Sequence, residues 1–460
     1  MKNIVLLVFL LSQCLAAQAQ WDLRHNISDA EKVYALSLFW SEAKYNFAFF
    51  DQTEVNWDSA YQEYIPKVLE TKNTYDFYRI LSRFCALLKD GHTDVSPPWD
   101  IFNSSTYIGV LFEKIGTHVY ISNIAREEAE RVPIGSELLK INGEDALTFI
   151  EREVLPYVSA STEHELWKEA LNGAIYALLT DTVQTLTLEC QTPAGESIAF
   201  ETSLKNNPYE WARKRRPWKR VDFELLTGNI GHLMLNTFGE DSVIIDFQAL
   251  LPELRKCASI IIDLRRNGGG NTGYGAEILK YFTDEDLVGS KWKTREHKSA
   301  YYAWGANMEW PQDYDSLSSE DQDWVKEAFE TGRRNHWYEG DMMQFENDIE
   351  TDKIDVPVVV LFGNNTASAA EDFLIFIDGM KREMMTVGQK SFGSTGQPIA
   401  FKLPAGAWAR ICSKRDTYPD GREFVGYGVA PDVPVEITRE ALISGEDLEL
   451  KKALEILENK

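Results

Sequence analysis

Apolar residues are spaced differently in successive parts of the chain. After residue 28 they recur at helical spacing, as in VYALSLFW and FYRILSRFCALL, with Ser28 and Thr74 placed as helix caps. After residue 105 they form short strands such as HVYISNIA and TLTLECQT, interrupted by a helical insertion at about 162–179. The predicted units are a helical domain over residues 20–100 and a β module over residues 105–204.

Strands and helices alternate in the second half of the chain, which predicts a layered α/β domain over residues 215–440 and a C-terminal helix over 441–460. The apolar strand SIIIDL contains Asp263, which we expect to be an anchoring hydrogen-bond acceptor for Arg265. A segment at about 292–355 is rich in Trp, Tyr, Asp and Glu. We expect it to be an insertion that covers one face and shapes a substrate cleft.

Residues 1–19 have the pattern of a secretory signal, with Lys2, an apolar core and the small-residue site Ala17-Gln18-Ala19. No later apolar run approaches the roughly 20 residues of a membrane-spanning helix. The sequence therefore predicts a protein secreted across the inner membrane, periplasmic or extracellular.

The formal net charge of −25 argues against binding to nucleic acid or to an anionic membrane surface. Metal-ligand spacing and cofactor motifs are absent, so neither a metal nor a cofactor is predicted. The sequence does not indicate an oligomeric state. The four cysteines after the signal are far apart and in apolar contexts, which favours buried free thiols. They are Cys85, Cys190, Cys257 and Cys412.

The segment LFGNNTASAAE places Ser368 where an apolar strand turns into an apolar helix. Such a turn lifts a hydroxyl out of the backbone, and the N–H groups of the helix start face a developing oxyanion. A serine near a helix start is more often a cap than a nucleophile. Ser368 is therefore a candidate whose role depends on the rest of the chain.

Four segments in order, LLKDGHTDV, IIDLRRNGGG, NNTASAAE and GYGVAPDVPV, resemble the S41 peptidase family of tail-specific or C-terminal processing serine peptidases and their tricorn-like relatives. The resemblance implies an α/β multidomain fold: a helical N-terminal domain, a PDZ-like β module and a crotonase/ClpP-like layered α/β catalytic domain. It also implies that Tyr107, Ile108, Gly109 and Val110 form a peptide-binding loop, although a β module that only gates the site is the alternative.

The resemblance implies a role for each motif. Ser368 matches the nucleophile, and the oxyanion hole pairs the Ala369 N–H with that of Gly269 or Gly270, each donor contributing about 3 kcal/mol. NGGG is otherwise a tight turn, since its spacing lacks a nucleotide fingerprint.

The proton acceptor differs between branches of the family. One branch uses a Lys where this chain has Ser394, so the tricorn-like branch fits better, with His92 of DGHT as general base. That branch orients the imidazole with an acid, for which Glu423 is preferred over Asp416.

The predicted function is that of an exported serine peptidase acting on peptides or polypeptides through an acyl-enzyme. The alternatives are a non-catalytic protein that binds peptides or apolar ligands, and an esterase using the same site. Ser368, the glycine loop and His92 together favour catalysis, because a binding protein gains nothing from keeping all three.

Overall fold

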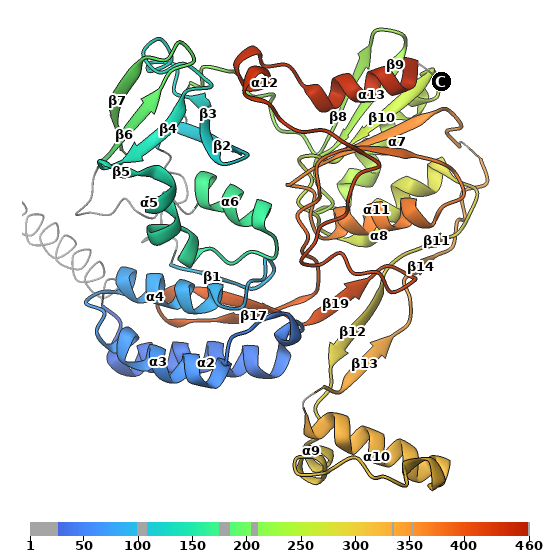
Figure 1. The fold of residues 1–460 in the computed structure, drawn as a ribbon. Helices are drawn as coiled ribbons and strands as arrows, with labels where there is room; N and C mark the ends of the chain where they lie inside the picture. Colours follow the sequence, from blue (N-terminus) through green and yellow to red (C-terminus); the bar gives the residue numbers. More distant parts are fainter. Residues whose placement is uncertain are drawn as a thin grey trace, which may run out of the picture.

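The computed structural model describes residues 26–98, 108–173, 185–203, 210–333, 335–351 and 353–458. Figure 1 shows a helical region, a β module and a layered α/β part, with an arm that leads away from them. The predicted signal, residues 1–19, lies outside the described residues. Within them, no helix is both long and apolar enough to cross a membrane.

The helical region contains three helices and a short 3₁₀ turn: α2 (Asp29–Asn46), η1 (Phe50–Gln52), α3 (Trp57–Leu69) and α4 (Thr74–Ala86). The predicted cap at Ser28 is confirmed, because its hydroxyl accepts the Glu31 N–H (3.3 Å) in a capping box. The predicted cap at Thr74 is wrong. Asn73 caps α4 instead, and the Thr74 hydroxyl accepts the N–H of Ile27 (3.2 Å).

A hairpin from the C-terminal half packs on these helices. Strand β18 (Trp408–Cys412) pairs with β17 (Pro398–Lys402) and, on its other side, with β1 (Asp94–Ser96). Phe39 of α2 contacts Phe401 of this layer, and it also contacts Trp57 and Phe84 of the helical core. The chain that follows His92 is therefore held beside a hairpin from the far end of the sequence.

The β module has its own apolar core and lies where strands are predicted. The strand order is β2-β3-β4-β6-β7, with β5 paired to β4. Two helices, α5 (Ala146–Glu153) and α6 (Glu163–Asn172), pack on it, and Thr162 caps α6. The strands are β2 (Val110–Ile115), β3 (His118–Ile124), β4 (Glu137–Ile141), β5 (Glu144–Asp145), β6 (Leu186–Gln191) and β7 (Ser197–Thr202).

The α/β part is a six-stranded sheet in the order β20-β16-β15-β10-β9-β8, parallel except for β8 with β9. Helices α7 (Ser242–Leu254), α8 (Thr272–Leu279) and α11 (Ala369–Gly379) share a core on one face. Helix α13 (Leu448–Glu458) covers the other face and follows α12 (Arg439–Ser444). The strands are β8 (Val221–Leu226), β9 (Ile230–Leu235), β10 (Ser259–Asp263), β15 (Val358–Phe362), β16 (Met385–Gly388) and β20 (Val433–Pro434).

Strands β10 and β15 are buried along their whole length, which is why their sequences are continuous apolar runs. They are parallel neighbours, so the loops after them meet at one edge of the sheet. The predicted pairing of Asp263 with Arg265 is confirmed (2.7 Å). Burial alone would raise the pKa of Asp263, but Arg265 and His232 hold this pKa well below its usual range.

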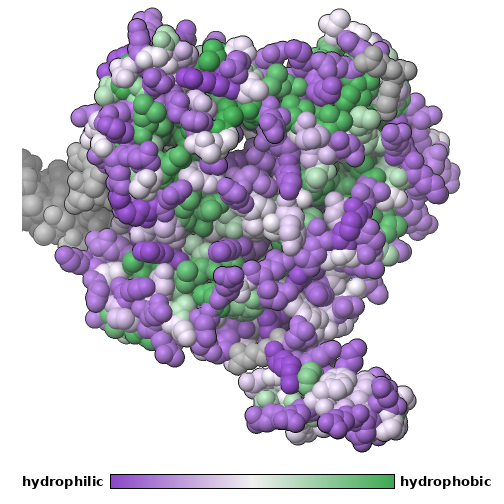
Figure 2. Space-filling model, viewed as in Figure 1, coloured by the Kyte–Doolittle hydropathy of each residue, from purple (hydrophilic) through white to green (hydrophobic). Residues whose placement is uncertain are grey.

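The insertion differs from its prediction. Strands β12 (Lys291–Arg295) and β13 (Trp337–Gly340) form an antiparallel pair, and β12 also pairs with β19 (Lys414–Thr417). The helices beyond it, α9 (Ser299–Gly305) and α10 (Ser319–Gly332), pack on each other and stand away from the body in Figure 1. In Figure 2 this tip is mostly hydrophilic.

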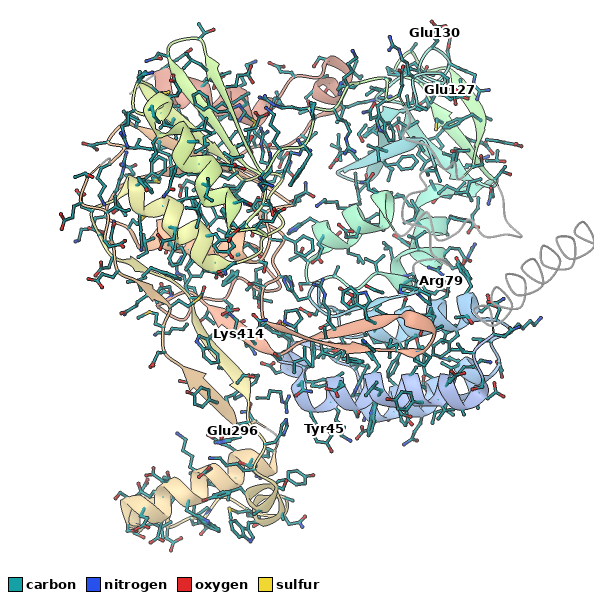
Figure 3. All side chains as sticks on the ribbon, turned by 180° about the vertical axis from the view of Figure 1, so that it is seen from behind. Tyr45, Arg79, Glu127, Glu130, Glu296 and Lys414 are labelled. Carbon is teal, nitrogen blue, oxygen red and sulfur yellow. The ribbon has the colours of Figure 1, made fainter. Side chains whose placement is uncertain are left out.

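The arm contacts the helical region at the point where β12 leads into α9. Figure 3 shows Tyr45 of α2 near the end of the arm that carries Glu296. His297 bonds to the Tyr45 carbonyl oxygen and contacts its ring (5.4 Å between centroids). The return from the arm forms β14 (Gln344–Phe345), which pairs with β11 (Leu287–Val288). Helices α9 and α10 therefore form no cover over the body.

The four cysteines after the predicted signal, Cys85, Cys190, Cys257 and Cys412, are all buried and free, which confirms that prediction.

Candidate active site

Ser368 occupies the turn between β15 and α11, with φ 56° and ψ −125°. This backbone conformation strains a non-glycine residue by about 1–3 kcal/mol, so it persists only where the surrounding structure holds it in place. Its N–H is held by the Ser394 carbonyl oxygen (3.2 Å) and by Glu371 Oε2 (3.1 Å). The residue is only half-buried, so the turn leaves the serine partly exposed to a substrate.

The glycine loop after β10 touches this turn. Gly269 has φ +98°, and a Cβ there would lie 2.7 Å from the Ala367 carbonyl oxygen and from Ser368 Cβ, and 3.1 Å from the Ala369 nitrogen. The two loops are also joined by the Ala367 N–H, which donates to the Asn267 carbonyl oxygen (3.1 Å). Bare backbone is thus packed directly against the serine, as the sequence predicts.

The backbone donors near the serine are not equivalent. The Gly269 N–H is used within its own loop, where it donates to Asn267 Oδ1 (2.9 Å). Across the described part of the chain, the N–H groups of Gly270 and Ala369 have no protein acceptor. Ala369 also begins α11, whose N-terminal dipole favours negative charge. The sequence left two glycines as candidates for the oxyanion hole, and Gly270 is the one whose N–H is available to a substrate.

His92 follows α4 in a loop anchored on both sides. The Asp90 carbonyl oxygen accepts the Thr93 N–H (3.2 Å), and the Thr93 hydroxyl accepts the Cys412 N–H (3.0 Å) from β18. The imidazole is 9% exposed, and its Nδ1 lies 2.7 Å from the hydroxyl oxygen of Ser394. The hairpin on the helical region thus fixes where the ring sits.

Ser394 contacts both of the residues predicted to react. Its hydroxyl bonds to the His92 ring, while its carbonyl oxygen accepts the Ser368 backbone N–H (3.2 Å). Ser394 is fully buried. The imidazole from the helical region and the backbone of the serine turn from the α/β part are therefore both held by one residue. Among the described atoms no hydrogen bond joins His92 to Ser368 directly.

The surroundings of His92 favour its neutral form. Burial, together with the nearby cations of Arg410 and Lys414, lowers the pKa of His92 to about 3. Figure 3 places Lys414 where the hairpin meets the α/β part. A neutral imidazole has a lone pair that can accept a proton, so the ring is in the state that a general base needs at neutral pH.

Glu371 supports the serine turn from beneath. It is fully buried in α11 and accepts hydrogen bonds from the Ser391 hydroxyl, the Gly393 N–H (2.8 Å) and the Ser368 N–H (3.1 Å). Burial raises the pKa of Glu371 to about 8, against the lowering by these donors. One carboxyl group thus ties the serine turn to the loop that contains Ser394.

The first turn of α6 joins the same loops from the β module. The Ser161 hydroxyl accepts the Gly91 N–H (2.9 Å) beside His92. The Thr162 hydroxyl donates to the Phe392 carbonyl oxygen (3.0 Å), and His164 Nε2 bonds to that of Ser391 (2.7 Å). All three parts of the protein therefore meet at this site.

The acid predicted to orient His92 is placed elsewhere. Glu423 pairs with Arg415 and accepts from Gln52 (3.3 Å), so neither carboxylate oxygen reaches the imidazole. Asp416 is a buried residue of β19, not of a turn, and it pairs with Lys414 (3.0 Å). In the described structure, the ring nitrogen that such an acid would hold bonds to Ser394 instead.

The predicted peptide-binding loop is described only in part, since Tyr107 lies outside the described residues. Ile108 and Gly109 precede the edge strand β2, which begins at Val110. Their carbonyl oxygens accept bonds from inside the module, from Thr202 and from the Ala125 N–H (2.7 Å) respectively. Farther along β2, the Asn172 side chain of α6 pairs with the N–H (3.2 Å) and the carbonyl oxygen (3.1 Å) of Phe112.

Sequence reasoning missed four supporting residues: Asn267, Glu371, Ser394 and His164. For Asn267, a signal existed, because an Asn before glycines commonly bonds to backbone two residues on. Glu371 also had one, because it and Asp372 place two charges in the first turn of a helix that is otherwise apolar there. The other two contact residues far away in the sequence, so no local pattern indicated them.

Comparisons with known proteins match two parts of the chain to protein families. The model of peptidase family S41 matches residues 229–435, and that of the tricorn protease C1 domain matches residues 28–86. A carboxyl-terminal-processing protease from Picosynechococcus sp. is 21% identical over 429 residues, which cover 89% of this chain and 86% of that protein.

Two solved structures share the fold over almost the whole chain. Mature CPAF has a TM-score of 0.69 at 14% identity, covering 94% of this chain and 98% of its own. A putative peptidase from Parabacteroides merdae has a TM-score of 0.51 at 18% identity, covering 94% and 97%. Both share the mixed α/β fold. The family matches, in the order in which the helical and α/β parts occur here, place residues 229–435 in the S41 family of serine peptidases, which are hydrolases, and residues 28–86 with the tricorn protease C1 domain.

Proposed function

We propose that this protein is an exported peptidase that cleaves peptide bonds through an acyl-enzyme on Ser368, with His92 as general base. The observation that carries the proposal is the shared contact with Ser394, which holds a buried neutral imidazole and the strained serine turn on two sides of one residue. The glycine loop packed against that turn supplies donors where charge develops.

In the proposed reaction, Ser368 Oγ bonds to the carbonyl carbon of the substrate while its proton passes to His92 Nε2. The substrate oxygen becomes an oxyanion, which the N–H groups of Ala369 and Gly270 stabilise. The C–N bond then breaks, and the proton moves from His92 to the leaving amine. Water, deprotonated by His92, releases the acyl group and restores the serine hydroxyl.

The test combines labelling with a fluorophosphonate and hydrolysis of a peptide library. Ser368→Ala should abolish both in a protein that still unfolds cooperatively, and His92→Gln should reduce labelling by about 10²–10⁴-fold. A folded wild type that neither labels nor cleaves would favour the non-catalytic binding alternative. Faster hydrolysis of acylated sugars than of any peptide would favour the esterase.

We further infer that the β module is PDZ-like and directs cleavage toward chain ends, with Ile108, Gly109 and Val110 next to the bound carboxylate. The carboxyl-terminal-processing relative and the edge position of β2 support this. A substrate with a free C-terminus should be cleaved faster than the same peptide carrying a C-terminal amide. Equal rates for the two would remove this part of the proposal.

Export is proposed from residues 1–19 alone. Cell fractionation followed by N-terminal sequencing checks it, with a mature protein that begins at Gln20 outside the inner membrane as the expected result. A cytoplasmic protein that keeps Met1 would contradict it.

A further inference from the structure

We propose that Ser394 is the positioning residue that orients the His92 imidazole, a task that serine peptidases commonly give to a carboxylate. The inference rests on the proposed function and adds a residue to it. It starts from geometry: Nδ1 of the ring and the Ser394 hydroxyl oxygen are 2.7 Å apart, and both residues are buried. Within the described chain, this is the one hydrogen bond of the ring.

A hydroxyl can donate or accept, so the bond is compatible with the tautomer in which Nε2 acts as the base, and we assign that tautomer as part of the proposal. When Nδ1 carries the proton and donates it to the Ser394 oxygen, Nε2 is left with its lone pair for the Ser368 proton. The opposite tautomer presents an N–H to the serine and cannot accept. Fixing the tautomer is the main service of the third group in a catalytic triad.

In the described structure none of the nearby acids bonds to the imidazole. Asp90 Oδ1 accepts from the Ser161 hydroxyl (3.3 Å), and its Oδ2 is buried with no hydrogen-bond partner among the described residues. Asp94 pairs with Arg410 and Asp416 with Lys414, so the hairpin side presents two cations to the ring. Glu423 is bound to Arg415. A neutral hydroxyl thus takes the place at Nδ1.

An orienting hydroxyl has a consequence that a carboxylate lacks. It adds no negative charge beside the imidazole, so nothing at Nδ1 raises the basicity of the ring against its burial and the two cations. The acid side of the pH–rate profile should therefore lie well below the ordinary pKa of histidine, near 6.5.

The backbone of Ser394 already holds the Ser368 N–H, and a side-chain substitution leaves that bond intact. Ser394→Ala therefore tests the hydroxyl alone. Thr395→Val is the matched control, because Thr395 is the next residue, is also buried and loses a hydroxyl that does not touch His92. The readouts are fluorophosphonate labelling from pH 4 to 9, and ¹⁵N NMR of the histidines, with His92→Gln identifying the signals of His92.

We expect Ser394→Ala to label about ten- to a hundredfold more slowly, within the contribution of general base catalysis. Its His92 signals should show mixed tautomers, while Thr395→Val keeps the wild-type rate and tautomer. Ser394→Asp places a carboxylate at Nδ1 and should move the acid side of the profile to higher pH. Wild-type labelling by Ser394→Ala, or slower labelling with an unchanged tautomer, would overturn the inference. Labelling that persists in Ser368→Ala would instead reject the proposed function.

Discussion

Exchanging Gly269 for alanine tests the contact on which the site is built. The new Cβ would lie 2.7 Å from the Ala367 carbonyl oxygen and from Ser368 Cβ. Gly268 provides a matched control in the same loop. A Cβ on Gly268 meets nothing within 4 Å, and its φ lies outside the left-handed range that disfavours side chains.

The size of the effect follows from these distances. Ordinary contact begins at 3.4 Å, so the serine turn must withdraw from 2.7 Å by the difference, about 0.7 Å. A misplacement of about 1 Å costs on the order of 10²-fold in rate, which corresponds to about 2.7 kcal/mol of activation free energy. Alanine at positive φ adds about 1–2 kcal/mol of backbone strain to the folded state.

Labelling rate, kcat/KM for a peptide and urea unfolding should be measured together on both variants. We expect Gly269→Ala to lose about 10²-fold in labelling while most molecules remain folded, since the strain is small against a typical stability of about 5–15 kcal/mol. Gly268→Ala should match the wild type in all three. If Gly269→Ala labels as fast as Gly268→Ala, the glycine loop does not position the serine, and our reading of the site is wrong.

Two further predictions concern the supports of the site. His164→Ala removes the bond to the Ser391 carbonyl oxygen and should slow labelling by up to about tenfold, the equivalent of about 1.4 kcal/mol. His118→Ala, a change at an exposed histidine of the same module, should leave the labelling rate unchanged. Equal effects of the two substitutions would exclude a role for α6. Folding raises the pKa of Glu371 from 4.5 to about 8. Between these two pH values the folded state keeps a proton that the unfolded state releases, so the wild type loses stability as pH rises from 4.5 to about 8. Asp90, Glu165 and Asp416 act in the same direction, so the measurement is the difference between wild type and Glu371→Gln in urea unfolding from pH 4.5 to 9. The variant should lose less stability over that range, and parallel curves would contradict the assignment.

Features fixed by local pattern were predictable from the sequence. The continuous apolar runs of β10 and β15, the turn at Ser368 and the glycine loop each follow from a few neighbouring residues. Their meeting was expected from the resemblance to the S41 family, and in the structure it follows because β10 and β15 are parallel neighbours whose loops lie at one edge. The Thr74 cap failed at a single position, since Asn73 before it competes for the same role and is at least as good a cap.

Features that depend on distant pairing were not predictable. The role of Ser394 depends on a hairpin that carries β18 to β1, and position 394 was read only as a missing lysine. Glu423 was placed at the imidazole by its distance along the chain, but Arg415 across the same turn captures its carboxylate. The arm was expected to cover a face because it is rich in aromatic residues. These residues instead pair with one another, as Trp304 does with Trp324.

The division of the site among three parts of the chain bears on when hydrolysis can begin. On the proposed roles, a growing polypeptide has its base by residue 92 but no nucleophile until residue 368, and the Ser391 loop that α6 holds comes later still. On these roles, a ribosome-bound or half-translocated molecule lacks part of the site and cannot yet cleave a peptide. Activity therefore begins only when folding has brought the three parts together.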